Sequence, residues 1–386
     1  FKGYDPIAIN ADVKEENFKT TFYVIPKFHD GDNEHMHAVV NGISCFRGGE
    51  HIKMFQRKFF SGLLENIKPE SRKAKVVPNR NDVAAGLLVF AVTQMKAPSF
   101  DSQSKTFLIN QDAAKFVERG LSENMFRGLK RKHADWIESI IQRAIERSSS
   151  KDKKEAERIT KKASKSKVAK LADATGRDRS KCILIVGEGD SAVGGIGQER
   201  NPSIHGVMPL RGKIMNVHET TPAQALKSQA LADIVSALGL VYGKKADPKN
   251  LRYGKLWIAT DEDVDGYHIL CLLVNFITKY WPELMENKRS PFVNKIETPF
   301  IILKKGNQRK YIYEADYHSF KPENYKGWEI TRAKGLGTLE SQEWKDILNN
   351  PRLIGISDDG NMKDTLDLLF NEKRADDRKK WLEGTP

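Results

Sequence analysis

The residues best suited to chemistry lie in the stretch GKLWIATDEDVDGYHI (254–269), where an acidic segment follows an apolar run. If Asp261 and Asp263 leave a strand in extended form, their side chains project to the same side, because side chains alternate with a period of two. Two carboxylates placed so close repel each other unless a cation lies between them. Mg²⁺ suits such a pair, since it takes one or two carboxylates, keeps several waters and accepts phosphate oxygens.

A further acid, Glu188, comes directly after another short apolar run in VGEGDSAVGG (186–195). The glycines on either side of Glu188 permit a close approach of the backbone. Ligands of parallel α/β sheets bind at the carboxyl ends of the strands. If the two strands are neighbours, we expect Glu188 to face Asp261 and Asp263, with Asp265 close by. The sequence therefore predicts a metal site made by these four acids.

Other interpretations of the same segments are weaker. D-x-D-x-D-G (261–266) matches the start of an EF-hand loop, but loop position 12 is Leu272 instead of Glu, and the preceding segment is strand-like. GGIG (194–197) lacks the Lys-Ser/Thr of a phosphate-binding P-loop. A purely structural role, in which the aspartates only cap the next helix, stays open at this stage.

The chain as a whole is strongly basic, with a formal net charge of +13 and a pI of about 9.4. Such an excess favours a polyanionic partner, with nucleic acid first, although a solvated basic surface is the alternative. Two glycine-containing segments carry cations suited to phosphate oxygens. They are MPLRGKIMNV (208–217), with Arg211 and Lys213, and ITRAKGLGT (330–338), with Arg332 and Lys334. Each could also be an ordinary surface turn.

Helices and strands must position these residues, and the pattern of residues 1–118 predicts a mixed α/β fold. Strand-like runs rich in Val, Ile and aromatic residues occur at 22–28 and 36–43. In 48–67 apolar residues recur at helical spacing, and 81–95 opens with an Asn/Asp cap and passes into a strand-like run.

From residue 179 onward, strands and helices alternate. The strand-like runs are 181–186 and 255–260, and the helical stretches are 222–240 and 266–287. This alternation predicts an α/β layer with a largely parallel sheet. Between the two parts, residues 119–178 are amphipathic and then dense in Lys, which predicts a long basic helical connector with a flexible break at SSSKDKKE (148–155).

Cysteine usage and hydropathy indicate the cellular compartment in which the protein is expected. Cys45, Cys182 and Cys271 form no C-x-x-C pair, so a disulfide framework or a zinc ribbon is not expected and a reducing, cytoplasmic compartment fits. No apolar run reaches the roughly 18 residues of a membrane span, and the first residues do not resemble a signal peptide. We expect no membrane partner.

Four ordered motifs identify a family. EGDSA (188–192), PLRGKIMNV (209–217), TDEDVDGYHI (260–269) and KGLGT (334–338) resemble the Toprim domain of type IIA DNA topoisomerases. VNGISCFRGGEH (40–51) and FDSQSKTFL (100–108) resemble the transducer domain of the same enzymes. The resemblance covers nearly the whole chain. Its later segments are closest in style to the large subunit of T-even phages and to eukaryotic topoisomerase II.

The resemblance implies a fold and a division of the chain. A ribosomal-S5-like transducer domain would occupy 1–118, a long helical connector 119–178, and a Rossmann-like Toprim domain with a C-terminal extension 179–386. Glu188, Asp261 and Asp263 match the Mg²⁺-binding, catalytic acids, and Asp265 matches a further acid of the motif. Glu188 also matches the proposed general acid/base of strand religation.

Further roles carry over by the same resemblance. Gln103 and Lys105 match residues that contact ATP, with Lys105 reaching the γ-phosphate, while the ATP itself is bound mainly by a domain expected upstream of Phe1. Arg211, Lys213 and Lys334 match basic positions near the DNA backbone, and Arg332 lies beside them. The sequence departs from the family at Ser104, Glu262 and Ala333, and none of these changes removes a metal ligand.

The implied function is that of the central part of an ATP-dependent type II DNA topoisomerase subunit. Its partners would be double-stranded DNA, a winged-helix domain or cleavage subunit that carries the cleaving tyrosine, and a second copy in a dimer. The compartment would be the nucleus of a eukaryote or the host cytoplasm of a phage. Two alternatives stay open: another Toprim enzyme, a primase or nuclease without a transducer, or a non-catalytic basic DNA clamp that holds a structural ion.

Overall fold

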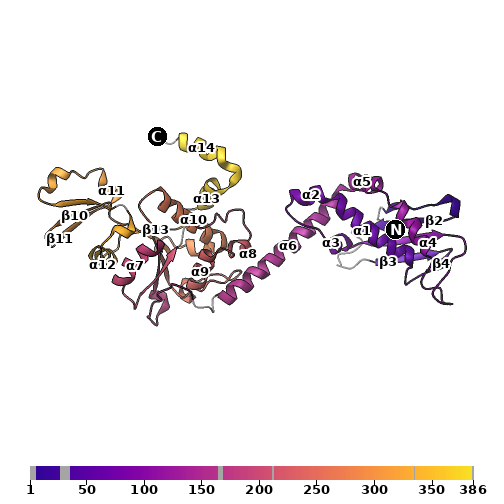
Figure 1. Ribbon diagram of the computed structural model, residues 1–386, viewed down its shortest axis with the longest axis horizontal. Helices are drawn as coiled ribbons and strands as arrows, with labels where there is room; N and C mark the ends of the chain where they lie inside the picture. The colour runs from indigo at the N-terminus through magenta and orange to yellow at the C-terminus, as the bar shows by residue number, and fades with distance from the viewer. Residues whose placement is uncertain (1–5, 27–34, 164–167, 211–212, 334, 385–386) are drawn as a thin grey trace. The chain divides into compact units, whose positions relative to one another are not determined.

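The computed structural model describes the chain except for residues 1–5, 27–34, 164–167, 211–212, 334 and 385–386 (Figure 1). It divides into two compact units, Phe1–Lys151 and Asp152–Pro386. The elements that begin in the first unit are β1 (Ile7–Asn10), η1 (Lys14–Glu16), β2 (Lys19–Ile25), β3 (His35–Val40), β4 (Ile43–Ser44), α1 (Glu50–Asn66), α2 (Lys68–Lys73), α3 (Arg80–Ala84), β5 (Leu88–Gln94), α4 (Gln111–Gly120), α5 (Glu123–Lys132) and α6 (Ala134–Ala163).

The second unit contains three successive groups of elements. Its first half comprises η2 (Arg179–Lys181), β6 (Ile183–Glu188), α7 (Gly189–Glu199), β7 (His205–Leu210), α8 (Pro222–Ala225), α9 (Gln229–Leu238), η3 (Pro248–Asn250), β8 (Lys255–Ala259), α10 (Val264–Tyr280), η4 (Pro282–Met285) and β9 (Val293–Ile296). A small sheet region follows, with β10 (Ile301–Lys305), β11 (Gln308–Ile312), α11 (Glu314–Tyr317), η5 (Pro322–Tyr325), β12 (Glu329–Arg332) and η6 (Leu336–Thr338). The last elements are α12 (Ser341–Asn349), β13 (Leu353–Ile356), α13 (Met362–Phe370), η7 (Glu372–Arg374) and α14 (Ala375–Glu383).

The first unit is built on a five-stranded mixed sheet in the order β1-β2-β5-β3-β4, in which only the β3–β5 pair among these strands is parallel. Helix α1 packs an aromatic face against this sheet, because Phe55 and Phe59 recur at helical spacing and are fully buried. The ring of Phe55 stacks on Phe22 of β2 at a centroid distance of 4.0 Å. The predicted mixed α/β fold of this part is confirmed.

Helix α6 is continuous over 30 residues, so the predicted flexible break at 148–155 is wrong. Serine costs a helix only about half a kcal/mol relative to alanine, and tertiary contacts outweigh that cost. Trp136 and Ile140 are buried in the core of the first unit, and Ala156 is buried in the core of the second. Within the predicted break, Asp152 accepts hydrogen bonds from the Thr221 hydroxyl (2.6 Å) and the Ala223 amide (3.2 Å), which hold it in the helix.

The second unit has a five-stranded sheet in the order β13-β9-β8-β6-β7. Strands β9, β8, β6 and β7 are mutually parallel, and β13 is antiparallel at one edge, so the predicted parallel-sheet α/β fold is confirmed. Alternate side chains of the central strands enter different cores. Leu184 and Ile258 pack with α9 and α10, whereas Ile185 and Trp257 pack with α7 and α12. Helices therefore cover both faces, as a doubly wound sheet requires.

Two of the predicted helices differ in extent. The stretch 222–240 forms two helices, α8 and α9, with a break between Ala225 and Gln229; Thr221 caps the start of α8 with a capping box, and Gly239, at φ 75°, ends α9. The stretch 266–287 is α10, which ends before Pro282, followed by a separate 3₁₀ turn. A residue that precedes proline is disfavoured in the α conformation, which accounts for the break.

All three cysteines are free thiols. Of the helices in the described ranges, none is both long and apolar enough to cross a membrane.

The contact between α7 and α12 supplies a matched stability test. A Cβ added at Gly195 would lie 2.5 Å from the ring of Trp344, which is fully buried, whereas a Cβ at the neighbouring Gly194 would meet nothing within 4 Å. We expect Gly195→Ala to lower the free energy of unfolding by about 1–3 kcal/mol, since overpacking forces side chains to shift. Gly194→Ala should be neutral or stabilising by up to about 1 kcal/mol, because alanine is the better helix former.

Urea denaturation of the chain, followed by tryptophan fluorescence, measures both variants. An equal change in the two variants would contradict this account of the α7–α12 packing.

Candidate magnesium and phosphate site

The acidic residues meet because β6 and β8 are adjacent parallel strands, with Gly187 opposite Ala259 in the register. Glu188 ends β6, and the acidic turn 260–263 follows β8 at the same edge of the sheet. The Asp261 amide donates a hydrogen bond to Oε2 of Glu188, at 3.3 Å. The condition set from the sequence, that the two strands be neighbours, is thus met, and Glu188 lies against the turn.

The carboxyl group of Glu188 lies in an environment that disfavours its charge. Burial raises the pKa of Glu188 above its ordinary value, and the negative charges of Asp261, Asp263 and Asp265 raise it further, although the hydrogen bond from the Asp261 amide acts in the opposite direction. Glu188 is half-buried, so this repulsion is only partly screened by water. A cation among these carboxylates would relieve the repulsion.

Asp261 is held by the segment that contains the KGLGT motif. Its Oδ1 accepts a hydrogen bond of 2.7 Å from the Leu336 amide. Gly335 makes this approach possible, since a Cβ there would lie 2.9 Å from Oδ2 of Asp261. Gly266 has the same effect on the other side, because a Cβ there would lie 2.1 Å from the Asp261 carbonyl oxygen. Both glycines are therefore needed by the geometry of the turn.

The other two aspartates have different surroundings. Asp263 is exposed, and its Oδ1 caps α10 by accepting a hydrogen bond of 2.8 Å from the Gly266 amide. The helix-capping interpretation thus applies to Asp263, and its other carboxylate oxygen makes no cap contact. Asp265 lies on the exposed first turn of α10 and pairs with Lys213 at 2.5 Å. That hydrogen bond lowers the pKa of Asp265.

The donor set fits Mg²⁺ in its chemistry. Within the described ranges, no group of three or more Asp, Glu, His or Cys side chains is already arranged to hold a metal ion. Mg²⁺ does not require such a cage, because it is held by one or two carboxylates together with water and substrate phosphate. Glu188 with Asp261 or Asp263 provides hard oxygen donors whose charges repel one another without a cation.

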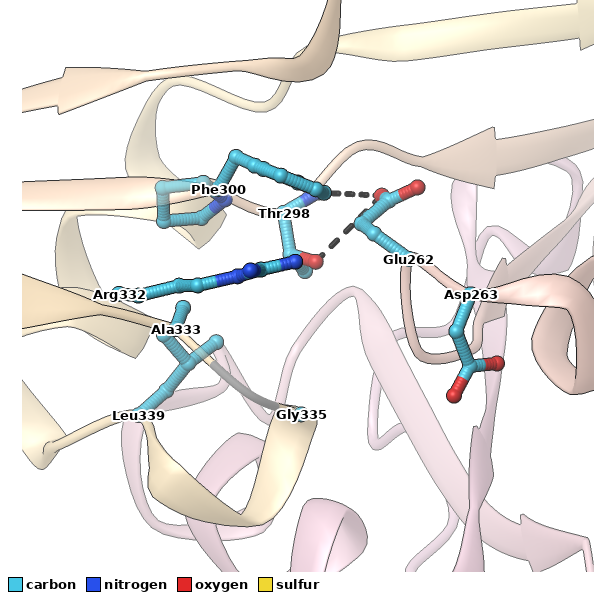
Figure 2. A pocket seen from close by; sticks show the side chains of 9 residues that line it. Glu262, Asp263, Thr298, Phe300, Arg332, Ala333, Gly335 and Leu339 are labelled. Atoms are coloured by element: carbon cyan, nitrogen blue, oxygen red, sulfur yellow. Dashed lines mark hydrogen bonds between the residues drawn. The ribbon is translucent and has the colours of Figure 1, made fainter. Parts of the chain in front are cut away.

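Glu262 lies between the two aspartates, and the sequence assigned no role to it. Figure 2 shows its carboxylate directed at Thr298, whose amide donates to it at 2.9 Å, while Asp263 points elsewhere. Both carboxylate oxygens of Glu262 also lie 2.6 Å from Nζ of Lys295. Two features of the sequence could have revealed this pair: the period-two alternation that turns Glu262 away from its neighbours, and a lysine between Val293 and Ile296 in the short segment that forms β9.

A cavity of about 310 Å³ opens beside the acidic turn (Figure 2). Its lining consists of Glu262, Asp263, Thr298, Pro299, Phe300, Arg332, Ala333, Gly335 and Leu339. Arg332 is exposed and its guanidinium lies 5.0 Å from the centroid of the Phe300 ring. One of the predicted phosphate-binding cations is thus brought beside the acidic turn. Arg211 and Lys334 lie outside the described residues.

The predicted ATP-contacting residues belong to the first unit. Gln103 and Lys105 are exposed on a loop before Thr106. Asp101 anchors this loop: it pairs with Arg47 at 2.7 Å and accepts a hydrogen bond of 3.2 Å from the Phe107 amide. Lys105 has φ 54°, in the left-handed region, as do five other described residues that are not glycine.

Three family models match successive parts of the chain. The model described as "DNA gyrase B" matches residues 3–171, "Toprim domain" matches 183–295, and "C-terminal associated domain of TOPRIM" matches 296–386. The predicted order of a transducer-type region followed by a Toprim domain is thus confirmed.

The relatives agree with these matches. DNA topoisomerase 2-beta of Gallus gallus is 34% identical over 370 residues, which cover 89% of this chain and 22% of that protein. Human DNA topoisomerase 2-alpha is 30% identical over 372 residues, with 89% and 23% covered. A crystal structure titled as the Plasmodium falciparum topoisomerase II DNA-binding, cleavage and re-ligation domain matches 57% of this chain and 32% of its own, with a TM-score of 0.51 and 34% identity.

The chain spans less than a quarter of the length of these curated relatives. The span contains the transducer-type region, the Toprim domain and the C-terminal domain associated with Toprim, in that order. The parallel sheet with acids at the ends of β6 and β8 belongs to the Toprim part. The chain therefore belongs to the type IIA DNA topoisomerases, of which it forms the transducer and Toprim region.

Proposed function

We propose that this region acts within an ATP-dependent type II DNA topoisomerase and that its second unit supplies the acids for Mg²⁺-dependent DNA cleavage and religation. The observation that carries the proposal is the meeting of Glu188 with the acidic turn, where the Asp261 amide donates to Glu188 and three aspartate charges act on its carboxyl group. The match of residues 3–171 to the gyrase B model counts against a primase or nuclease, for which no transducer was expected.

The residues have separate roles in the proposed reaction. Bound Mg²⁺ would stabilise the negative charge that develops on phosphate oxygens. Glu188 and Asp261, with Asp263, would hold the ion. Glu188 would also act as the general acid/base that exchanges a proton with the 3′ oxygen of the DNA, and burial together with the neighbouring aspartates raises its pKa above that of an ordinary carboxyl group. Lys213 and Arg332 are exposed beside the acids and would bind the DNA backbone, with Arg211 and Lys334 assigned to the same role from the sequence.

The partners and nucleotide follow from the same proposal. The nucleophile would be a tyrosine on a winged-helix domain or on a separate cleavage subunit, and the substrate would be double-stranded DNA held by a dimeric assembly. Lys105 and Gln103 would contact ATP bound by another domain, and the anchoring of their loop by Asp101 supports this role. The compartment would be the one that holds the DNA, which is the nucleus in a eukaryote and the host cytoplasm for a phage.

Binding of Mg²⁺ can be tested on the chain without a cleavage partner. An ion that binds only the folded form at ten times its dissociation constant adds about 1.4 kcal/mol to the free energy of unfolding. We expect Asp261→Asn and Glu188→Gln to lose most of this Mg²⁺-dependent gain, which a thermal melt with a Mg²⁺ titration measures.

Asp364→Asn is the matched control, because Asp364 is an exposed acid of α13 in the same unit. It should keep the full Mg²⁺ response. If all three variants respond as the wild type does, the assignment of these acids to Mg²⁺ is wrong.

Cleavage can be tested once the tyrosine-bearing partner is added. Asp261→Asn and Glu188→Gln should lower Mg²⁺-dependent DNA cleavage by about 10²- to 10⁴-fold, because general acid/base catalysis and electrostatic stabilisation are lost. DNA affinity should stay within about threefold at fixed salt, since the contacts of the basic residues with the DNA backbone dominate it. A gel assay of cleaved plasmid and a filter-binding assay give the two readouts. Cleavage at the wild-type rate by both variants would refute the proposed chemistry.

A further inference from the structure

An ion pair with no assigned role is buried beside the acidic turn. The side chain of Lys295 is 1% exposed and that of Glu262 is 9% exposed. Nζ of Lys295 lies 2.6 Å from each carboxylate oxygen, and Thr298 adds its amide at 2.9 Å and its hydroxyl at 3.4 Å from Oε1. A carboxylate that receives several donors at once is restricted to one orientation.

The lysine is fixed as firmly as the glutamate. Lys295 lies on β9, directly opposite Ile258 of β8 in the parallel register. Its ammonium is 5.0 Å from the centroid of the Tyr267 ring, on the first turns of α10. The Tyr267 hydroxyl lies 3.2 Å from Oε2 of Glu262 and 2.7 Å from Oε2 of Glu314. The pair thus ties the acidic turn to β9, to α10 and to the start of α11.

The contacts of Glu262 also orient the two aspartates beside it. Glu262 is the residue between Asp261 and Asp263, so holding its side chain on one side of the turn directs its neighbours to other sides. Asp261 then reaches the Leu336 amide and Glu188, and Asp263 caps α10. A buried ion pair is not required for stability, because well-packed uncharged side chains can replace it without loss. Specific orientation is what such a pair supplies here.

We infer that Glu262 and Lys295 are positioning residues, which hold the acidic turn so that Asp261 lies against Glu188 and Asp263 caps α10. The purpose of this positioning, Mg²⁺ binding, rests on the proposed function. Neither residue touches the ion or the DNA in this role.

The test separates positioning from stability by removing the charges singly and together. Lys295→Met leaves the Glu262 carboxylate buried without its cation, and we expect the thermal midpoint to fall by roughly 10 °C. The double variant Glu262→Gln with Lys295→Met removes both charges and should recover most of that loss. It is the informative variant because it folds while lacking the ion pair.

Two measurements are made on the double variant. Hydrogen exchange, read by mass spectrometry, reports on the amides of Asp261 and Leu336, which form the hydrogen bonds of the turn; we expect their exchange to become at least about tenfold faster. A Mg²⁺ titration followed by the thermal midpoint reports on the site, and we expect half-saturation to need about tenfold more Mg²⁺.

The chain offers a matched control. In the same unit, Lys304 lies 2.9 Å from Glu343, whose side chain is 1% exposed, and also 2.9 Å from the more exposed Glu340. Glu343→Gln with Lys304→Met makes the same chemical change at the contact between β10 and α12. It should leave both the exchange of the acidic turn and the Mg²⁺ titration as in the wild type.

The outcomes distinguish a positioning role from an effect on general stability and from the proposed binding of Mg²⁺. A double variant at Glu262 and Lys295 with wild-type exchange and wild-type Mg²⁺ half-saturation overturns the positioning role. An equal loss in the Lys304 and Glu343 control also overturns it, because the effect would then be one of general stability. Faster exchange in the turn, combined with a wild-type chain that gives no Mg²⁺ response at all, supports the positioning role and refutes the metal proposal.

Discussion

The parallel pairing of β6 with β8 is the constraint on which the rest of the site depends. It places the end of one strand, Glu188, beside the turn that follows the other. The Asp261 amide then bridges the two through its hydrogen bond to Glu188. Adjacent parallel strands need long crossover connections, and here the 66 residues between Glu188 and Lys255 include the helices α7 and α9, which cover the two faces of the sheet, and the edge strand β7. The parallel pairing of β6 with β8 thus accounts both for the helices that cover the sheet and for the site at its edge.

Negative charge gathered at that edge must be balanced, and the molecule balances it in three ways. Glu262 is neutralised inside the protein by Lys295, and Asp265 is neutralised at the surface by Lys213. Glu188 and Asp261 receive backbone amides but no cation among the described side chains. Burial, together with the charges of the neighbouring aspartates, raises the pKa of Glu188. A divalent cation at this place would complete the balance of charge, which is the role proposed above for Mg²⁺.

Glycine is what allows the backbone to come so close to these carboxylates. Gly266 and Gly335 lie against Asp261 from two segments far apart in sequence, and a side chain at either position would collide with it. The motifs DVDG and KGLGT therefore belong to one structural unit. The cavity beside them has Arg332 on its wall, so acid and base face the same space.

Much could be predicted from the sequence by itself, for reasons of local chemistry. Apolar periodicity and the alternation of strand and helix are local properties, so they indicated a mixed α/β part followed by a parallel-sheet part. Short motifs with fixed spacing indicated the family, and carboxylates after apolar strands indicated where a metal could bind. The helix across 148–155 was mispredicted because its stability comes from contacts at both ends, which local composition does not contain.

Only the tertiary structure decided which residues of the acidic segment do what. Asp261, Glu262 and Asp263 are chemically alike and adjacent, yet one meets Glu188 and Leu336, one is buried against Lys295, and one caps a helix. Their partners lie 33 to 75 residues away along the chain, apart from the local cap. Local sequence determines how many carboxylates the turn carries. Long-range packing determines where each carboxylate points, because only the folded domain brings those partners to the turn.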